Sequence, residues 1–144
     1  MNKTDPCFKW FEMAQEDLRA AEFLLDMYPR PIEIICYHCE QAAEKMLKGV
    51  LVANNIEPPK THDLMVLCRR CGEIDAAYEE LMDNCVDLTP YGVQVRYPYE
   101  FELVESDMFR PIQMCRELCD AVELKMGIQQ VPEEKPGFGE MQFS

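Results

Sequence analysis

Apolar residues recur at intervals of three and four positions through most of this 144-residue chain. This spacing places them on one face of an α-helix, and the alternating pattern of a half-buried strand is nearly absent. The chain has only six glycines, and three of them follow residue 126. The sequence therefore predicts an all-α protein.

Prolines divide the first half of the chain into two long helices. The first is predicted over about 6–27, because the sequence Tyr-Pro-Arg-Pro at 28–31 cannot continue a helix. The second is predicted over about 31–54, before a pair of asparagines and a pair of prolines. Its apolar stripe is the most regular in the chain and consists of Ile35, Cys36, Cys39, Ala42, Ala43, Met46, Leu47 and Val50.

Two shorter helices are predicted next. Thr61 is a candidate N-cap for the third helix, with Asp63 in the first turn, where the helix dipole favours an anion. Gly72 is expected to end this helix. Asp75 is a candidate cap for a fourth helix over about 76–85.

The last helix is predicted from Ser106, as its cap, to about Met126, after a loop over 86–104. Pro111 lies five positions into this helix, so the helix either begins nearer Met108 or is kinked at the proline. The segments together predict an up-and-down bundle of four or five helices. Such a bundle often leaves one apolar face, which a homodimer would cover.

Length and charge limit the classes of protein that fit. Residues 1–126 suit one domain, and residues 127–144, with two prolines and three glycines, are predicted to be a disordered tail. The net charge is −13, which disfavours non-specific binding to nucleic acid. No apolar stretch approaches the roughly 18 residues of a membrane helix, and the first residues lack the apolar core of a signal peptide. We therefore expect a cytoplasmic protein with no membrane contact.

Eight cysteines include two CxxC pairs, at 36–39 and 68–71. On helices, both thiols of each pair face the same side, and two such pairs could form a four-thiolate zinc site. The pairs also fall in the apolar stripes of their helices, where cysteine behaves as a small hydrophobic residue. We favour core packing, and a metal site remains the alternative. A thioredoxin-like redox pair would need a βαβ context that the chain does not have.

Several polar residues are candidates for a binding site. Glu44 and Lys48 are spaced as an i, i+4 ion pair, which is either a surface pair or one wall of a polar pocket. The sequence Arg-Tyr-Pro-Tyr at 96–99 either packs over the end of the bundle or forms another wall, since arginine binds phosphate and tyrosine stacks on bases. His38 is interpreted as structural. His62 either caps a helix or donates a side-chain hydrogen bond, or it belongs to the pocket.

Three segments together resemble a known family. They are Cys-Tyr-His-Cys-Glu-Gln-Ala-Ala-Glu-Lys-Met-Leu-Lys at 36–48, Pro-Lys-Thr-His-Asp-Leu at 59–64 and Arg-Tyr-Pro at 96–98. In this order they resemble a HEPN (higher eukaryote and prokaryote nucleotide-binding) domain over about residues 8–126. The resemblance implies a helical bundle, usually a homodimer and often encoded beside a minimal nucleotidyltransferase. Similar sequences commonly carry small or aliphatic residues at the cysteine positions, which favours core packing.

Catalytic HEPN proteins are metal-independent ribonucleases that carry an arginine, four to six residues and then a histidine near the start of the last long helix. This chain departs from that signature. Its nearest pair, Arg30 and His38, has seven intervening residues, and no histidine follows His62. The histidine that would move a proton in attack by an RNA 2′-hydroxyl is therefore missing, and we expect no ribonuclease activity.

The sequence thus predicts a non-catalytic HEPN-like domain, akin to a toxin–antitoxin module. It would bind a nucleotide or nucleotide-like anion, dock on a nucleotidyltransferase partner, or do both. Lys48 and Arg96 would contact phosphate, and Tyr97 or Tyr99 would stack on a base. The predicted ligand-binding residues are Glu44, Lys48, His62, Arg96, Tyr97 and Tyr99. No catalytic residue, metal ligand or cofactor is predicted. The alternatives are a divergent endoribonuclease toxin that brings Arg96 and His62 together, and a zinc-stabilised helical interaction module.

Overall fold

The structure is a computed structural model that describes residues 4–92 and 103–128. This part of the chain contains five α-helices and no strand, which confirms the all-α prediction. The α-helices are α1 (Pro6–Phe23), α2 (Ile32–Ala53), α3 (Leu64–Ile74), α4 (Met82–Leu88) and α5 (Ser106–Met126). Three short 3₁₀ helices join them, namely η1 (Leu24–Asp26), η2 (Ala76–Leu81) and η3 (Thr89–Gly92).

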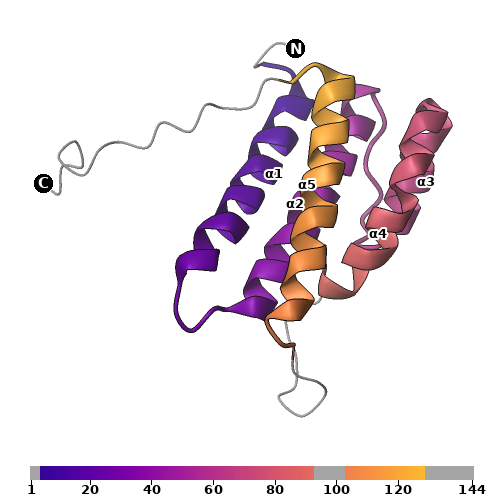
Figure 1. The fold of residues 1–144 in the computed structure, drawn as a ribbon. Coiled ribbons are helices and arrows are strands. Elements are labelled where there is room, and N and C mark those ends of the chain that lie inside the picture. The colour runs from indigo at the N-terminus through magenta and orange to yellow at the C-terminus, as the bar shows by residue number, and fades with distance from the viewer. Residues whose placement is uncertain (1–3, 93–102, 129–144) are drawn as a thin grey trace, which may run out of the picture.

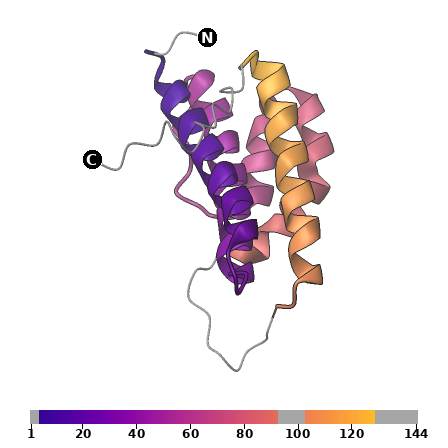
Figure 2. The same cartoon turned by 60° about the vertical axis from the view of Figure 1, so that its left-hand side comes forward.

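Helix α2 is the central element of the bundle and contacts each of the other four α-helices (Figure 1). α1 and α2 run antiparallel across a short turn. α5 begins at the end of the bundle where α2 begins, so these two helices run in the same direction (Figure 1). The view in Figure 2 shows α3 and α4 packed on the side of the bundle away from α1. This arrangement explains why the second predicted helix has the most regular apolar stripe, since α2 is covered on several sides.

One contact fixes how closely α1 and α2 approach. The ring of Phe11 lies over Gly49, where a Cβ would be only 2.6 Å from the nearest ring carbon. Phe11 is 1% exposed and belongs to a single hydrophobic core that extends through all five helices. Glycine is therefore needed at position 49 because no other residue leaves room for the ring.

Within the described residues, no helix is both long enough and apolar enough to span a membrane.

The ends of the first three helices differ in detail from the sequence prediction. α1 ends at Phe23, and the next three residues form η1 instead of a further α-helical turn. The N-cap of α3 is Asp63, whose side chain accepts a hydrogen bond from Met65 N, so the prediction of Thr61 as the cap is wrong. Thr61 Oγ1 instead accepts from Asp63 N and shapes the turn before the helix. The prediction that α3 breaks at Gly72 is also wrong, because the helix continues to Ile74.

The later segments also differ from the prediction. Asp75 acts as a cap, as predicted, but the helix that it caps is the 3₁₀ helix η2. The predicted loop over 86–104 begins later, since α4 extends to Leu88 and η3 follows it. The remainder of that loop, residues 93–102, lies outside the described residues, as does the predicted tail from residue 129 onward.

Helix α5 contains Pro111 without beginning later. It starts at Ser106, with Glu105 at the N-cap and no side-chain cap, so the prediction of Ser106 as the cap is wrong. Pro111 lacks the N–H that would bond to the carbonyl of residue 107, and this missing bond is confined to the second turn. The ring of Pro111 is buried, so packing against the core compensates for the lost bond. The helix ends at Gly127, which has a φ of 67°.

Candidate functional site

One face of α2 carries three charged residues that are nearly buried. Glu40, Glu44 and Lys48 follow one another at intervals of four and are 0%, 5% and 9% exposed, respectively. Removing charged groups from water is costly unless they gain partners. This row therefore marks the most unusual polar environment in the described part of the chain.

Glu44 joins two of the predicted site residues. Its Oε2 accepts from Lys48 Nζ at 3.4 Å, and its Oε1 accepts from His62 Nδ1 at 2.7 Å. The interpretation of Glu44 and Lys48 as a surface ion pair is wrong, because both side chains are almost completely covered. The His62 side chain is 77% exposed, so the cluster reaches the surface through the imidazole. We call Glu44, Lys48 and His62 the polar site.

The segment between α2 and α3 places His62 on this face. Asn55 turns the chain with a φ of 61°, and two prolines keep the following residues extended. The turn made by Thr61 and the cap made by Asp63 fix the residues on both sides of His62. His62 therefore does not cap α3 itself. It forms the side-chain hydrogen bond that the sequence analysis gave as the alternative to capping, and the partner is Glu44.

Glu40 belongs to this row but is not among the predicted ligand-binding residues. Its Oε2 accepts from Gln41 Nε2 at 2.7 Å, whereas its Oε1 is buried with no hydrogen-bond partner among the described residues. Burial, followed by the charge of Glu44, raises the pKa of Glu40 to about 8. Glu40 is therefore mainly protonated at neutral pH, so it does not add a second negative charge beside Glu44. The signal that could have found it is its position one helical turn before Glu44.

Glu40 is covered by η3. A Cβ added at Gly92 would lie 2.9 Å from the carboxyl carbon of Glu40. A side chain at position 92 would therefore require the Glu40 carboxyl group to move. The residues that follow Gly92 include Arg96, Tyr97 and Tyr99, which lie outside the described residues. The structure therefore brings together Glu44, Lys48 and His62, and the proposed roles of the other three remain predictions.

A second cluster on α2 repeats the same combination of groups. His38 Nδ1 lies 2.9 Å from Asp17 Oδ1, and Lys45 Nζ is hydrogen-bonded to Asp17 Oδ2. The Asp17 side chain on α1 is 13% exposed, and these two partners explain how a carboxylate is accommodated there. The His38 side chain is 27% exposed and fully engaged at Nδ1, in agreement with its interpretation as structural.

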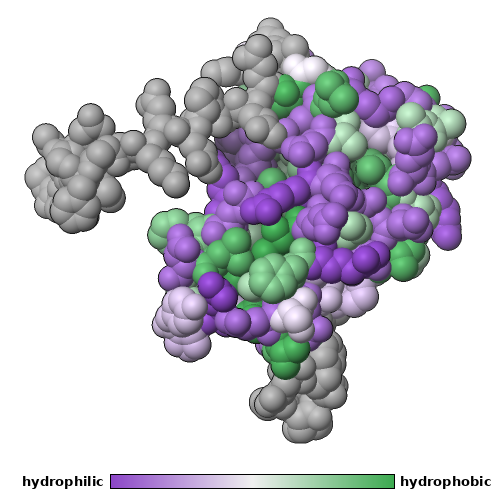
Figure 3. Space-filling model, viewed as in Figure 1, coloured by the Kyte–Doolittle hydropathy of each residue, from purple (hydrophilic) through white to green (hydrophobic). Residues whose placement is uncertain are grey.

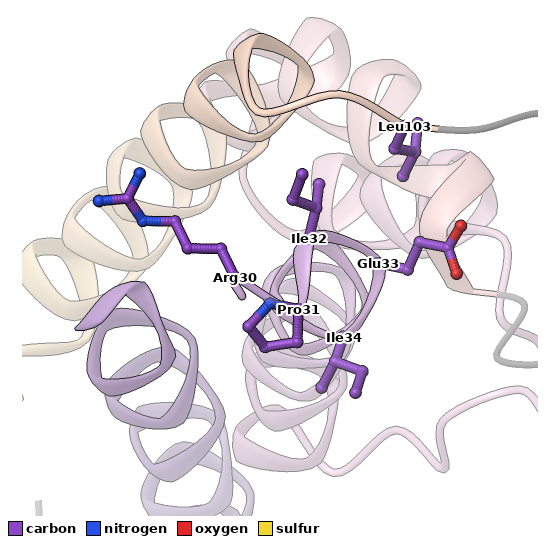
Figure 4. A pocket seen from close by; sticks show the side chains of 6 residues that line it. All are labelled: Arg30, Pro31, Ile32, Glu33, Ile34 and Leu103. Carbon is purple, nitrogen blue, oxygen red and sulfur yellow. The ribbon is translucent and has the colours of Figure 1, made fainter. Parts of the chain in front are cut away.

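Two grooves of the described surface lie away from the polar site. One, of about 320 Å³, is lined by Arg30, Pro31, Ile32, Glu33, Ile34 and Leu103. Figure 4 shows the Arg30 and Glu33 side chains extending in opposite directions from this groove. Another, of about 260 Å³, lies between η3 and the start of α5, where Arg110 pairs with Asp87 at 2.7 Å. Neither groove includes Glu44, Lys48 or His62.

The HEPN-domain family model matches residues 8–125. This chain belongs to the HEPN-domain family. The crystal structure of TT1696 from Thermus thermophilus has the same fold, with a TM-score of 0.72, 23% sequence identity, and coverage of 87% of this chain and 99% of that chain. The comparison with curated proteins gives no significant match. The prediction of a HEPN-like helical bundle is therefore confirmed.

All eight cysteine thiols of this HEPN domain are buried, and none of them forms a disulfide. They act as small core residues with weak donors, since Cys68 Sγ donates to the carbonyl of Tyr78 at 3.2 Å and Cys71 Sγ to that of Leu47 at 3.5 Å. Burial raises the pKa of Cys71 to about 12, so this thiol stays protonated. Residues 4–92 and 103–128 contain no group of three or more His, Cys, Asp or Glu side chains placed to hold a metal ion. These observations favour core packing.

Proposed function

We propose that this HEPN domain is a non-catalytic binding module whose polar site takes a nucleotide or a nucleotide-like anion. The observation that carries this proposal is that Lys48 has a single, long hydrogen bond among the described residues. Its ammonium group has three N–H donors, and its ion-pair partner Glu44 Oε2 is 3.4 Å away, longer than the usual 2.7–3.2 Å. A phosphate oxygen at this position would accept from an N–H donor that has no partner among residues 4–92 and 103–128.

The surroundings of Lys48 also suit an anion better than the net charge of −13 suggests. Glu40 is mainly uncharged at neutral pH, so one carboxylate instead of two lies beside the ammonium. His62 presents an exposed ring whose Nδ1 is fixed by Glu44, which leaves Nε2 directed to solvent. Arg96 would add a second phosphate contact, and Tyr97 or Tyr99 would stack on the base.

The direct test is isothermal titration of the purified chain with ATP, GTP and their monophosphates. We expect micromolar binding that Lys48→Met and Arg96→Ala each weaken at least tenfold. Lys9→Met is the matched control, because Lys9 is an exposed lysine on α1 that forms an ion pair with Glu12 and lies outside the polar site. Thermal melts of each variant separate loss of binding from loss of folding. No heat from any nucleotide with the folded wild-type chain would contradict the proposal.

The function proposed for the assembled protein is that of a homodimer that docks on a nucleotidyltransferase-domain protein, as in a toxin–antitoxin-like module. The exposed hydrophobic side chains of the bundle support an assembled state, since large apolar groups in contact with water often mark an interface. Co-purification of the chain with a separately expressed nucleotidyltransferase-domain protein encoded beside it would test this docking. Free migration of both proteins on size exclusion would contradict it.

A divergent ribonuclease is the second candidate, and one observation favours it. The carboxylate of Glu44 orients the exposed imidazole of His62, which is the arrangement of a general acid–base pair. Cleavage of a fluorescent RNA that disappears in His62→Ala would support this candidate. Equal background cleavage by the wild type and His62→Ala would exclude it and leave the binding module.

A further inference from the structure

Large hydrophobic side chains are exposed at the end of the bundle where α1 ends and α5 begins. We call them the apolar end; they are Phe23, Met27, Tyr28, Val104 and Phe109, with exposed fractions between 52% and 81%. Figure 3 shows hydrophobic side chains gathered over the lower part of this face of the molecule. Single exposed apolar residues are normal on a monomer, but a group of aromatic ones is characteristic of an interface.

Two ion pairs hold the segments of the apolar end side by side. Arg30 joins the α1–α2 turn to Glu105 at 3.1 Å, and Arg116 of α5 joins Glu22 of α1 at 3.4 Å. The guanidinium group of Arg30 also lies 5.1 Å from the centre of the Tyr28 ring. The apolar end is therefore a surface made from three segments that ion pairs link to one another.

The charges around Phe23 are complementary to each other. Arg19 lies one helical turn before Phe23 and on the same side of α1, and Asp26 lies three residues after it. Both side chains are exposed, and neither has a hydrogen bond or ion pair with any described residue. The apolar centre of this surface is thus flanked by one cation and one anion that have no side-chain partner in the described part of the chain.

We propose that a second copy of this chain covers the apolar end through a two-fold contact centred near Phe23. In a two-fold interface, residue i of one copy meets residue j of the other, and j meets i. Arg19 of each copy then forms an ion pair with the partner's Asp26, so the interface contains two such ion pairs. This inference rests on the dimeric state proposed above and assigns its interface, and it is independent of the ligand.

Other occupants fit the same surface less well. A basic partner would pair with Asp26 but would leave Arg19 facing a like charge. An anionic membrane would be repelled by a chain of net charge −13. A second copy is the occupant that matches both charges and the apolar centre at once.

Sedimentation equilibrium of the full chain tests the apolar part of the interface. We expect a dimer whose dissociation constant rises at least about tenfold in Phe23→Ser, because a central aromatic side chain carries much of the energy of an interface. Leu124→Ser is the matched control, since Leu124 is 84% exposed near the C-terminal end of α5, away from the apolar end. We expect no change in that variant.

A charge exchange tests the two-fold pairing itself. Arg19→Asp and Asp26→Arg should each weaken self-association about tenfold or more, because each puts two like charges in contact. The double variant should recover the dimer. A mixture of the two single variants should form a heterodimer, since each then supplies the charge that the other has lost. Circular dichroism of each variant checks that the fold is unchanged.

Two results would overturn this inference. A wild-type chain that sediments as a monomer would remove the dimer as well as this interface, whether or not nucleotides bind. A dimer that tolerates Phe23→Ser and both charge changes would keep the dimer and assign it to another surface. Nucleotide titration of the monomeric Arg19→Asp variant separates both results from failure of the polar site.

Discussion

The carboxyl group of Glu40 lies so close to the backbone of Gly92 that a Cβ added there would be 2.9 Å from the Glu40 carboxyl carbon. This contact joins the centre of α2 to the last residue described before the segment that carries Arg96. The buried acid of Glu40 and the turn η3 are therefore energetically linked.

Gly92→Ala should lower the free energy of unfolding by about 1–3 kcal/mol, the usual cost of inserting a methyl group into a packed contact. Urea denaturation at neutral pH measures this loss. In a Glu40→Ala background the carboxyl group is absent, so the same substitution should cost much less. An equal loss in both backgrounds would show that the strain at Gly92 has another origin.

The contribution of Glu40 to the free energy of unfolding should fall as the pH rises from about 4.5 to about 8. Within this window the unfolded chain has released the Glu40 proton, whereas burial keeps it bound in the folded chain. The folded state then binds more protons at Glu40, so the contribution of this residue falls by up to ~1.4 kcal/mol per pH unit and is constant outside the window. Glu40→Gln should lose this slope. Urea denaturation of both proteins across the window, with the same slope in each, would contradict the assignment.

Lys48→Met should destabilise the fold by about 3 kcal/mol, because it leaves the buried Glu44 carboxylate without its cation. The double variant Glu44→Gln/Lys48→Met should lose clearly less than the sum of the single changes. Thermal denaturation of the four proteins gives the coupling. Strict additivity would mean that the two side chains do not interact in the folded protein.

Chelators should leave the melting temperature unchanged, because the thiols pack as core residues instead of binding zinc. The thiols should also stay unreactive toward a thiol reagent such as Ellman's reagent until the protein unfolds, since all eight are buried. A melting temperature that falls with EDTA, together with about one zinc per chain by elemental analysis, would support the zinc-stabilised alternative.

Much of the fold could be predicted from sequence because apolar spacing determines which residues face the core. The stripe of α2 is an example, since all of its predicted members are buried. The helix ends were predicted less well. Thr61 and Asp63 are both good N-cap residues, and only the backbone path after Pro59 decides which side chain reaches a free N–H.

The polar site could be predicted only in part. Helical spacing showed that Glu44 and Lys48 share a face, but their burial depends on the chain that returns over them from Asn55 to His62. Glu40 was missed for the same reason. Its neighbour Gln41 is equally polar, and the position of η3 determines which of the two is covered.

The close contact between the ring of Phe11 and Gly49 also has a kinetic consequence. α1 and α2 cannot slide along each other unless the Phe11 ring first moves away from Gly49, so this contact fixes the register of the two helices. Their central amides should therefore be the last to exchange with deuterium in the native state. Structural fluctuations that reach the polar site must instead start in the connection before α3 and in η3.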